Sequence, residues 1–132
     1  MIIGTGIDIV EIDRFRDAVK KWDRSFLGKI FTGREISYST KRRFKDQHLA
    51  ARFATKEAVL KAFGDTKGAV KKWTDIEITN DKNGKPCVSL HGSAEALGKK
   101  KGVREVVVSM SHSRNHAVAN AILIGRERKR KG

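Results

Sequence analysis

The order of periodic segments along the chain predicts an α+β domain, in which an antiparallel sheet packs around one long central helix. A strand opens the chain, helices follow, and the second half contains four strands with one helix between them. The 132 residues suffice for one domain with its own core, which we place at residues 1–125, and residues 126–132 form a basic tail.

The composition indicates what kind of partner the protein binds and in which compartment it acts. The formal net charge of +14 predicts a partner or substrate of opposite charge: a nucleic acid, an anionic membrane, a phosphorylated substrate or an acidic protein. Cys87 is the only cysteine, so no disulfide forms within the chain and a reducing compartment is expected. Residues 1–10 lack the basic start and the length of a signal peptide or membrane span. We therefore expect a cytoplasmic protein without a membrane segment.

Residues 2–10 alternate as a strand does. The odd-numbered positions from Ile3 to Ile9 face one way, and Gly4, Gly6 and Asp8 face the other. Glycine inside a strand often marks the close approach of a ligand or of another backbone. Asp8 is then either a functional carboxylate beside that approach or a residue that ends the strand in water.

Helical periodicity follows the strand. Residues 11–20 and 26–31 are expected to form two short helices. Thr32 and Glu35 have the capping-box spacing that begins a third helix. A basic run then leads into the long helix, for which Asp46 is the candidate N-cap.

The long helix carries two apolar rows. One is a stripe of large side chains at helical spacing, formed by Leu49, Phe53, Leu60 and Phe63. The other is a row of small residues four positions apart, which lets a neighbouring element approach closely, formed by Ala50, Ala54 and Ala58. Glu57 and Lys61 share one face beside the small row, and Gly64 stands where a left-handed helix cap is expected. Glu57 is either a solvated helix residue or a ligand for a positive group.

The second half of the chain has the pattern of strands joined by tight turns. Four strands are expected, at residues 73–79, 86–90, 104–112 and 116–124. Asn83 and Gly84 give a hairpin signal between the first two. A helix at residues 93–101, capped by Ser93 and closed by Gly102, separates the two pairs.

Three polar side chains are candidates for chemistry: Asp8, Glu57 and His112. Two carboxylates together with phosphate oxygens suit Mg²⁺, which typically takes one or two protein carboxylates and completes its shell with phosphate and water. The positive charge that a bound pyrophosphate needs is supplied by three residues of the long helix, Arg52, Lys56 and Lys61. The residues alone therefore support a hypothesis of metal-assisted phosphate chemistry, and a lone histidine such as His112 is more often structural than catalytic.

Four segments together resemble the holo-acyl-carrier-protein synthases, the small group of the 4'-phosphopantetheinyl transferases. They are Ile-Gly-Thr-Gly-Ile-Asp-Ile-Val at 3–10, Arg-Phe-Ala-Thr-Lys-Glu-Ala at 52–58 with 61–64, Asn-Gly-Lys-Pro at 83–86, and Ser-Met-Ser-His at 109–112. They occur in the family's order and at near-family distances, and the resemblance covers residues 1–124.

The resemblance implies an enzyme that transfers the 4'-phosphopantetheine group of coenzyme A to a serine of an apo acyl carrier protein and releases adenosine 3',5'-bisphosphate. Asp8 and Glu57 match the two carboxylates that hold Mg²⁺, and Lys61 matches a catalytic lysine at the pyrophosphate. Arg52 and His112 match groups near the nucleotide phosphates. The loop that touches the adenine side of the cofactor matches Asn83, Gly84, Lys85 and Pro86.

The resemblance also implies two kinds of protein contact. Arg14, Arg16 and Arg24 fall where the family's basic helix meets its acidic carrier protein. Family members are commonly homotrimers with active sites between subunits, in which the metal carboxylates come from one subunit and the hairpin loop from its neighbour. The chain departs from the family at Phe44, where many relatives carry a basic residue.

The main alternative is a basic nucleic-acid-binding module without catalytic activity, and a structural partner protein without chemistry is a third interpretation. The net charge and the basic runs favour the nucleic-acid binder, but aromatic side chains are not interleaved with those runs as in a single-strand binding platform. Asp8 discriminates among the three, because a magnesium enzyme requires a carboxylate among the strand glycines and a nucleic-acid binder does not.

Overall fold

The computed structural model describes residues 1–127, except for the side chains of residues 22–24. The elements, in chain order, are β1 (Ile2–Glu11), α1 (Ile12–Ile30), α2 (Gly33–Thr40), α3 (Lys45–Phe63), a 3₁₀ turn η1 (Trp73–Asp75), β2 (Ile76–Asn80), β3 (Pro86–Leu90), α4 (Gly92–Lys101), β4 (Val103–His112) and β5 (His116–Gly125). This is the expected α+β arrangement, although α1 is as long as α3, at 19 residues each.

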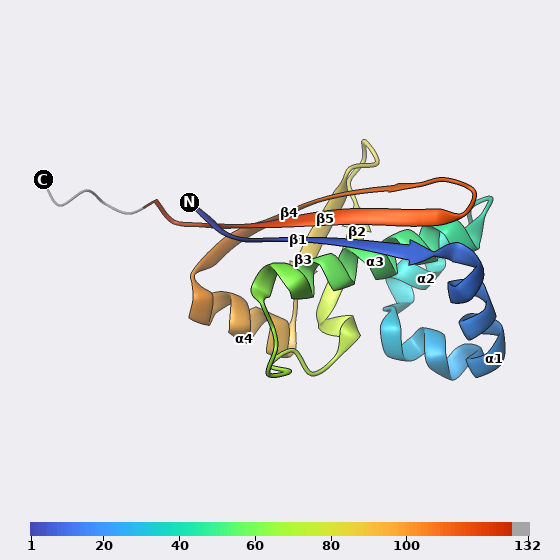
Figure 1. Cartoon of the computed structure of the whole chain (residues 1–132), viewed down its shortest axis with the longest axis horizontal. Coiled ribbons are helices and arrows are strands. Elements are labelled where there is room, and N and C mark those ends of the chain that lie inside the picture. The colour runs from blue at the N-terminus through green and yellow to red at the C-terminus, as the bar shows by residue number, and fades with distance from the viewer. Residues whose placement is uncertain (128–132) are drawn as a thin grey trace, which may run out of the picture.

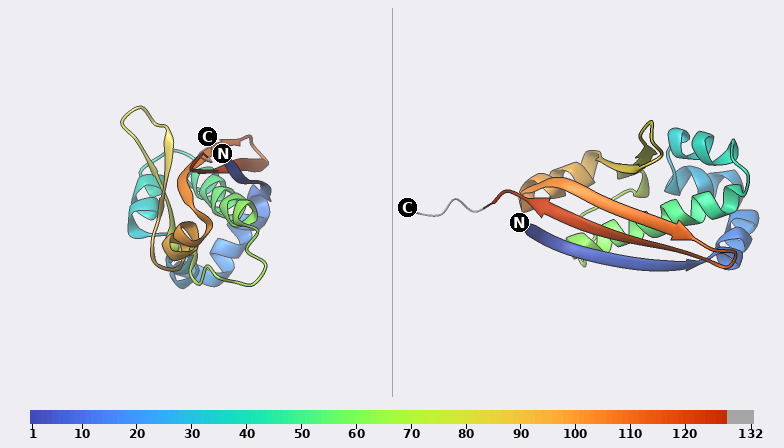
Figure 2. Two further views of the ribbon diagram at one scale, coloured as in Figure 1. Left: turned by 90° about the vertical axis from the view of Figure 1, so that its left-hand side faces the viewer. Right: turned by 90° about the horizontal axis from the view of Figure 1, so that it is seen from above.

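Two antiparallel sheets organise the chain. The larger has the strand order β1-β5-β4, and β2 pairs with β3 in a separate hairpin. The helices lie on one side of the larger sheet, with α3 running beneath it (Figure 1). Figure 2 shows the same three strands side by side along the length of the molecule. The opposite face of this sheet exposes Ile7, Ile9 and Val118.

Small residues on both partners let α3 lie against the sheet. Ala54 and Ala58 are fully buried in the same apolar cluster as Ala119 and Ala121 of β5. On β1, a Cβ atom at Gly6 would stand 2.0 Å from the carbonyl oxygen of Ala58. At Gly4 it would stand 2.0 Å from the carbonyl oxygen of Ala62. The strand glycines therefore mark the close approach of a backbone, and the small row of α3 has the expected role.

The helix boundaries contradict two expectations. Residues 11–20 and 26–31 belong to one helix, α1, because nothing between them breaks the helix: residues 21–25 contain neither glycine nor proline. Asp46 does not cap α3, which has Phe44 at its N-cap in the left-handed conformation, with φ 63°. The Asp46 carboxylate instead accepts a hydrogen bond from Arg16 Nε at 3.0 Å.

The second half differs from expectation at two points. Residues 73–75 form η1, and the strand that follows begins at Ile76. Ser93 does not cap α4, whose N-cap is His91, because the Ser93 hydroxyl is engaged by the Asp75 carboxylate and by the backbone N–H of Lys71. The capping box of α2 and the left-handed glycine caps at Gly64 and Gly102 are confirmed.

The expected basic tail, residues 126–132, lies mostly outside the described residues. Within residues 1–127, no helix combines the length and the apolar character that crossing a membrane requires.

The backbone contact between β1 and α3 predicts a strong difference between two glycine substitutions. Gly6→Ala should destabilise the fold by about 3 kcal/mol, because the new methyl group overlaps the Ala58 carbonyl and the helix must move away. Gly33→Ala is the control, since a Cβ there meets no atom within 4 Å and alanine favours the helix. Urea unfolding midpoints measure both effects, and a Gly6→Ala midpoint equal to that of Gly33→Ala would contradict the close contact.

Candidate active site

The β1–α3 contact brings Asp8 and Lys61 together. Asp8 lies on the same face of β1 as the two glycines, and only 8% of its surface is exposed. Its Oδ1 atom accepts a hydrogen bond from Lys61 Nζ at 2.8 Å, and the same ammonium donates to the carbonyl of Ile7 at 3.1 Å. Oδ2 of Asp8 is buried without a hydrogen-bond partner. Oδ2 is therefore the Asp8 oxygen that still has the capacity for a further partner.

Glu57 lies one helical turn before Lys61 and interacts with the same carboxylate. The pKa of Glu57 is raised to about 7, by burial above all, then by its contact with the Asp8 side chain and by the negative charge of Asp8, against an opposing effect of Lys61. The three side chains Asp8, Glu57 and Lys61 thus form one cluster. Asp8 in turn raises the pKa of Lys61, first by its hydrogen bond and then by its charge. The raised pKa of Glu57 means that its carboxyl group is partly protonated at neutral pH, near the ammonium group of Lys61.

The cluster fits a magnesium ion. The described residues contain no group of three or more His, Cys, Asp or Glu side chains that could hold a metal by themselves. Two carboxylates are nevertheless enough for Mg²⁺ when phosphate and water supply the other ligands. A divalent cation would give the unpartnered Oδ2 of Asp8 a partner and would favour the ionised form of Glu57, whose pKa is raised without it. Asp8 and Glu57 are therefore the residues that would hold the ion.

A mainly apolar groove of about 550 Å³ opens next to Glu57, between α1, the end of β1 and α3. Phe15, Ala18, Phe26 and Phe53 line its apolar part, and Arg14, Glu57 and His116 line its polar part.

The basic residues expected to meet a carrier protein differ in their surroundings. The side chain of Arg14 is 82% exposed and lies 4.0 Å from Glu11. Arg16 is engaged by Asp46 at 3.0 Å and by Asp13 at 3.1 Å. The side chain of Arg24 lies outside the described residues. Of the two that are described, Arg14 presents the more available charge beside the groove.

Arg52 belongs to a second cluster, on another face of α3. The guanidinium is 2% exposed, donates to the carbonyl of His48 at 3.2 Å and to the side chain of Asn80, and stacks on the ring of Tyr38 at 4.3 Å. Its Nε atom is buried without a partner. Because Arg52 and Glu57 are five residues apart, they project about 140° apart around the helix.

Two aromatic residues of this second cluster were not singled out from the sequence. His48 packs edge-on against His112, with ring centroids 5.6 Å apart, and against Tyr38 at 6.3 Å. Burial lowers the pKa of His48, and Arg52, His112 and Arg42 lower it further. The four-residue spacing of His48 and Arg52 on α3 could have indicated His48, whereas no local pattern indicates Tyr38.

The hairpin loop is shaped by Asp81. Its carboxylate accepts the backbone N–H groups of Asn83 at 2.8 Å and Lys85 at 2.9 Å, and Gly84 takes φ 83°. The Asn80 side chain, which accepts from Arg52, also donates to the carbonyl of Gly84 at 2.9 Å. Arg52 therefore joins the base of the hairpin to α3, and Pro86 begins β3 as expected.

Lys56 does not supply charge to either cluster. Its side chain has no exposed surface and is paired with Glu35 at 2.7 Å. The expectation that it neutralises a bound pyrophosphate is therefore wrong, because its charge is buried and already compensated.

Comparison with known proteins identifies the family of the chain. The model of the 4'-phosphopantetheinyl transferase superfamily matches residues 4–128, so the chain belongs to that superfamily. Within it, the chain is 48% identical over 125 residues to the holo-acyl-carrier-protein synthase of Syntrophus aciditrophicus, an alignment that covers 95% of this chain and 98% of the relative. The resemblance found in the sequence is confirmed, and the alternative of a nucleic-acid-binding module without catalytic activity is rejected.

Solved structures show the same fold. The holo-acyl-carrier-protein synthase of Neisseria meningitidis superposes with a TM-score of 0.85 at 33% identity, covering 94% of this chain and 99% of that one. The synthase of Helicobacter pylori, solved in complex with coenzyme A, has a TM-score of 0.80 at 28% identity and covers 91% of this chain and 99% of that one.

The raised pKa of Glu57 predicts how stability depends on pH in metal-free protein. Between the unfolded value of 4.5 and the folded value of about 7, the unfolded chain releases a proton that the folded chain keeps. The stabilisation of the folded state that comes from protonated Glu57 is therefore fully present below pH 4.5 and is lost as the pH rises towards 7. Relative to Glu57→Gln, wild-type protein in EDTA should show a falling melting temperature between pH 5 and pH 7, followed by a plateau.

Thermal melts at a series of pH values measure this difference. Glu105→Gln, which changes an exposed glutamate on β4, is the control and should show no such trend. A wild-type minus Glu57→Gln difference in melting temperature that is constant across the range would contradict the raised pKa of Glu57.

Proposed function

We propose that this chain is a holo-acyl-carrier-protein synthase, which transfers 4'-phosphopantetheine from coenzyme A to a serine of apo acyl carrier protein and releases adenosine 3',5'-bisphosphate. The observation that carries the proposal is the Asp8–Glu57–Lys61 cluster, in a chain whose relatives at 37–48% identity are synthases of this kind. The coenzyme A bound by the Helicobacter pylori enzyme supports coenzyme A as the donor.

The chemistry of the proposed transfer is mainly the neutralisation of charge. The P–O bond within the pyrophosphate of coenzyme A breaks as the serine oxygen bonds to the transferred phosphorus. Negative charge builds on the leaving phosphate and on the transferred phosphoryl group. When bound by Asp8 and Glu57, Mg²⁺ would supply positive charge at these oxygens. Lys61 adds a second cation, and because it already lies at Asp8 its position does not depend on the substrate.

The serine of the carrier protein must also lose a proton. Glu57 is in contact with Asp8 and lines the apolar groove, so it is placed to accept this proton. We assign the proton to Glu57, which accepts it directly or through a water molecule. The carrier serine would reach Glu57 along the apolar groove, whose rim includes Arg14 and which suits a mainly acidic carrier with apolar contact residues.

The active site is completed between subunits of a homotrimer, in our proposal. Two observations support it. The metal cluster and the Arg52–His112 cluster, with the loop Asn83, Gly84, Lys85 and Pro86, lie on different faces of α3, so one chain presents two half-sites. The outer face of the larger sheet also exposes Ile7 by 66% and Ile9 by 65%, which a second copy would cover. Such a trimer would act in the cytoplasm, in keeping with the single free cysteine.

Removal of either metal carboxylate should abolish transfer. Asp8→Asn and Glu57→Gln are each expected to lower turnover by at least about 100-fold, because each removes a charged ligand that stabilises the transition state. Mass spectrometry of an apo carrier protein incubated with coenzyme A and Mg²⁺ measures the transfer. Glu105→Gln is the matched control and should keep wild-type turnover, and unchanged turnover in either site variant would refute the metal assignment.

Reversal of charge at the groove should weaken the carrier selectively. Arg14→Glu is expected to raise the apparent KM for the carrier about tenfold and to leave the KM for coenzyme A within about twofold, because an acidic partner is repelled where it docks. Arg104→Glu makes the same change on an exposed position of β4 and should alter neither constant to this extent. Equal increases for Arg14→Glu and Arg104→Glu would show that only net charge matters and that docking occurs elsewhere.

A further inference from the structure

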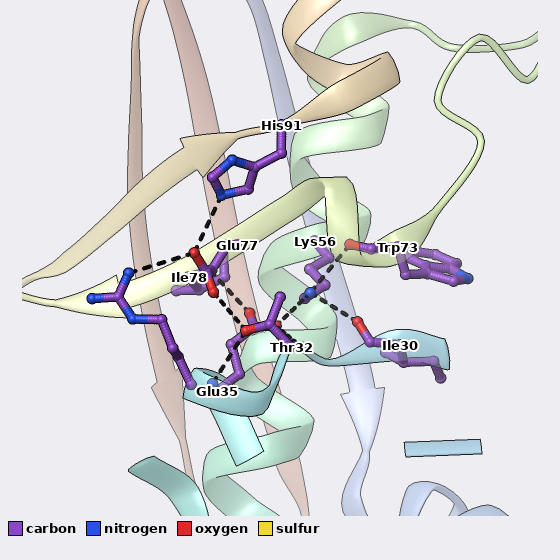
Figure 3. Close-up of polar contacts among 9 residues, drawn as sticks. Ile30, Thr32, Glu35, Lys56, Trp73, Glu77, Ile78 and His91 are labelled. Atoms are coloured by element: carbon purple, nitrogen blue, oxygen red, sulfur yellow. Dashed lines mark hydrogen bonds and ion pairs between the residues drawn. The ribbon is translucent and has the colours of Figure 1, made fainter. Parts of the chain in front are cut away.

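Lys56, the residue before Glu57, is a charged residue whose side chain is fully buried. Its side chain has 0% exposure, and all three N–H groups of the ammonium are used (Figure 3). They donate to Glu35 Oε1 at 2.7 Å, to the carbonyl of Ile30 at 2.8 Å and to the carbonyl of Trp73 at 3.2 Å.

Glu35 is equally saturated. Oε1 also accepts the backbone N–H of Thr32 at 2.8 Å, and Oε2 accepts the backbone N–H of Ile78 at 2.9 Å. The two oxygens of Glu35 thus accept from three donors, and Glu35 donates no hydrogen bond in return. The network continues through the Thr32 hydroxyl to Glu77 at 2.6 Å, and Glu77 lies 3.2 Å from His91.

The bonds of the Lys56–Glu35 pair join the elements that carry the proposed substrate contacts. Ile30 is the last residue of α1, which lines the carrier groove and bears Arg14. Trp73 and Ile78 flank the start of β2, which leads into the cofactor hairpin. Lys56 itself is the neighbour of Glu57 on α3. The pair therefore lies between three elements: α1, which lines the proposed carrier groove; β2, which leads into the proposed cofactor hairpin; and α3, which carries Glu57.

A buried ion pair is not explained by stability alone. Desolvation of two charges offsets most of their attraction, and apolar replacements of similar volume are often as stable. The metal carboxylates, moreover, are held by a different contact, the glycine face of β1 against α3. The pair is therefore not needed to hold the metal carboxylates, and its bonds instead fix the positions of α1 and the hairpin relative to α3.

We propose that Lys56 and Glu35 are positioning residues for the transfer: they fix α1 and the β2–β3 hairpin relative to Glu57, so that carrier serine and coenzyme A meet at the metal. This inference rests on the proposed function. It assigns neither residue a contact with substrate, because both are fully buried. Loss of the pair should lower the rate of the chemical step while leaving the metal cluster intact.

The test compares Lys56→Met, the double variant Lys56→Met/Glu35→Gln, and Val59→Ala as a control for general destabilisation of the same helix, since Val59 is also fully buried. The double variant leaves no charge of the pair in the core, and its melting temperature is compared with those of Lys56→Met and Val59→Ala. Its kcat should still be about 10- to 100-fold below wild type, because small misplacements of reacting groups cost this much. The Mg²⁺ concentration for half-maximal rate should stay within about twofold, and Val59→Ala should keep most of its kcat.

Amide hydrogen exchange supplies a readout that does not depend on activity. In the double variant, exchange should become faster at Ile78 and at the end of α1, and should stay as slow as in wild type in the middle of β1 and α3. A double variant that recovers both melting temperature and kcat overturns the proposal, and so does unchanged exchange at Ile78 and α1. If wild-type protein performs no transfer, the proposed function fails, and the exchange pattern still decides whether the pair holds these elements.

Discussion

The contact between the backbone of α3 and the glycine face of β1 is the constraint on which the rest of the structure depends. With no side chain at Gly4 or Gly6, the helix carbonyls of Ala62 and Ala58 come within the space that a Cβ would fill. This approach puts Asp8, the next residue on that face, against Lys61 and Glu57. A helix held further away by side chains would separate the two carboxylates, and Asp8 would then no longer raise the pKa of Glu57.

Once α3 is fixed in this way, each of its faces contacts a different part of the chain. Glu57 and Lys61 meet the strand, Arg52 meets Tyr38 and the base of the hairpin, and Lys56 meets the ends of α1 and η1. The small residues between these positions pack against β5. One helix thus orders the Asp8–Glu57–Lys61 cluster, a cationic aromatic cluster and a buried ion pair, each linked to a different part of the chain.

The sequence predicted the features that depend on local pattern. The alternation of β1 placed Asp8 with the glycines, and the N-cap of α2 and the C-cap of α3 followed from Thr32 and Gly64. It did not predict that Lys56 is buried, because helical periodicity cannot distinguish a lysine in solvent from one that finds three acceptors distant in sequence. Spacing along the chain also could not pair Asp8 with Glu57, since their meeting depends on tertiary packing; resemblance to a family supplied that pairing.

The position of Asp8 within its strand has a consequence for how ligands bind. Asp8 pairs with Ala119 in the middle of a hydrogen-bonded ladder, and Glu57 lies well inside a 19-residue helix. Neither carboxylate is on a loop that must close, so their geometry is preorganised before any ligand arrives. The conformational entropy of ordering these two groups is lost when the chain folds, and binding does not repeat that loss.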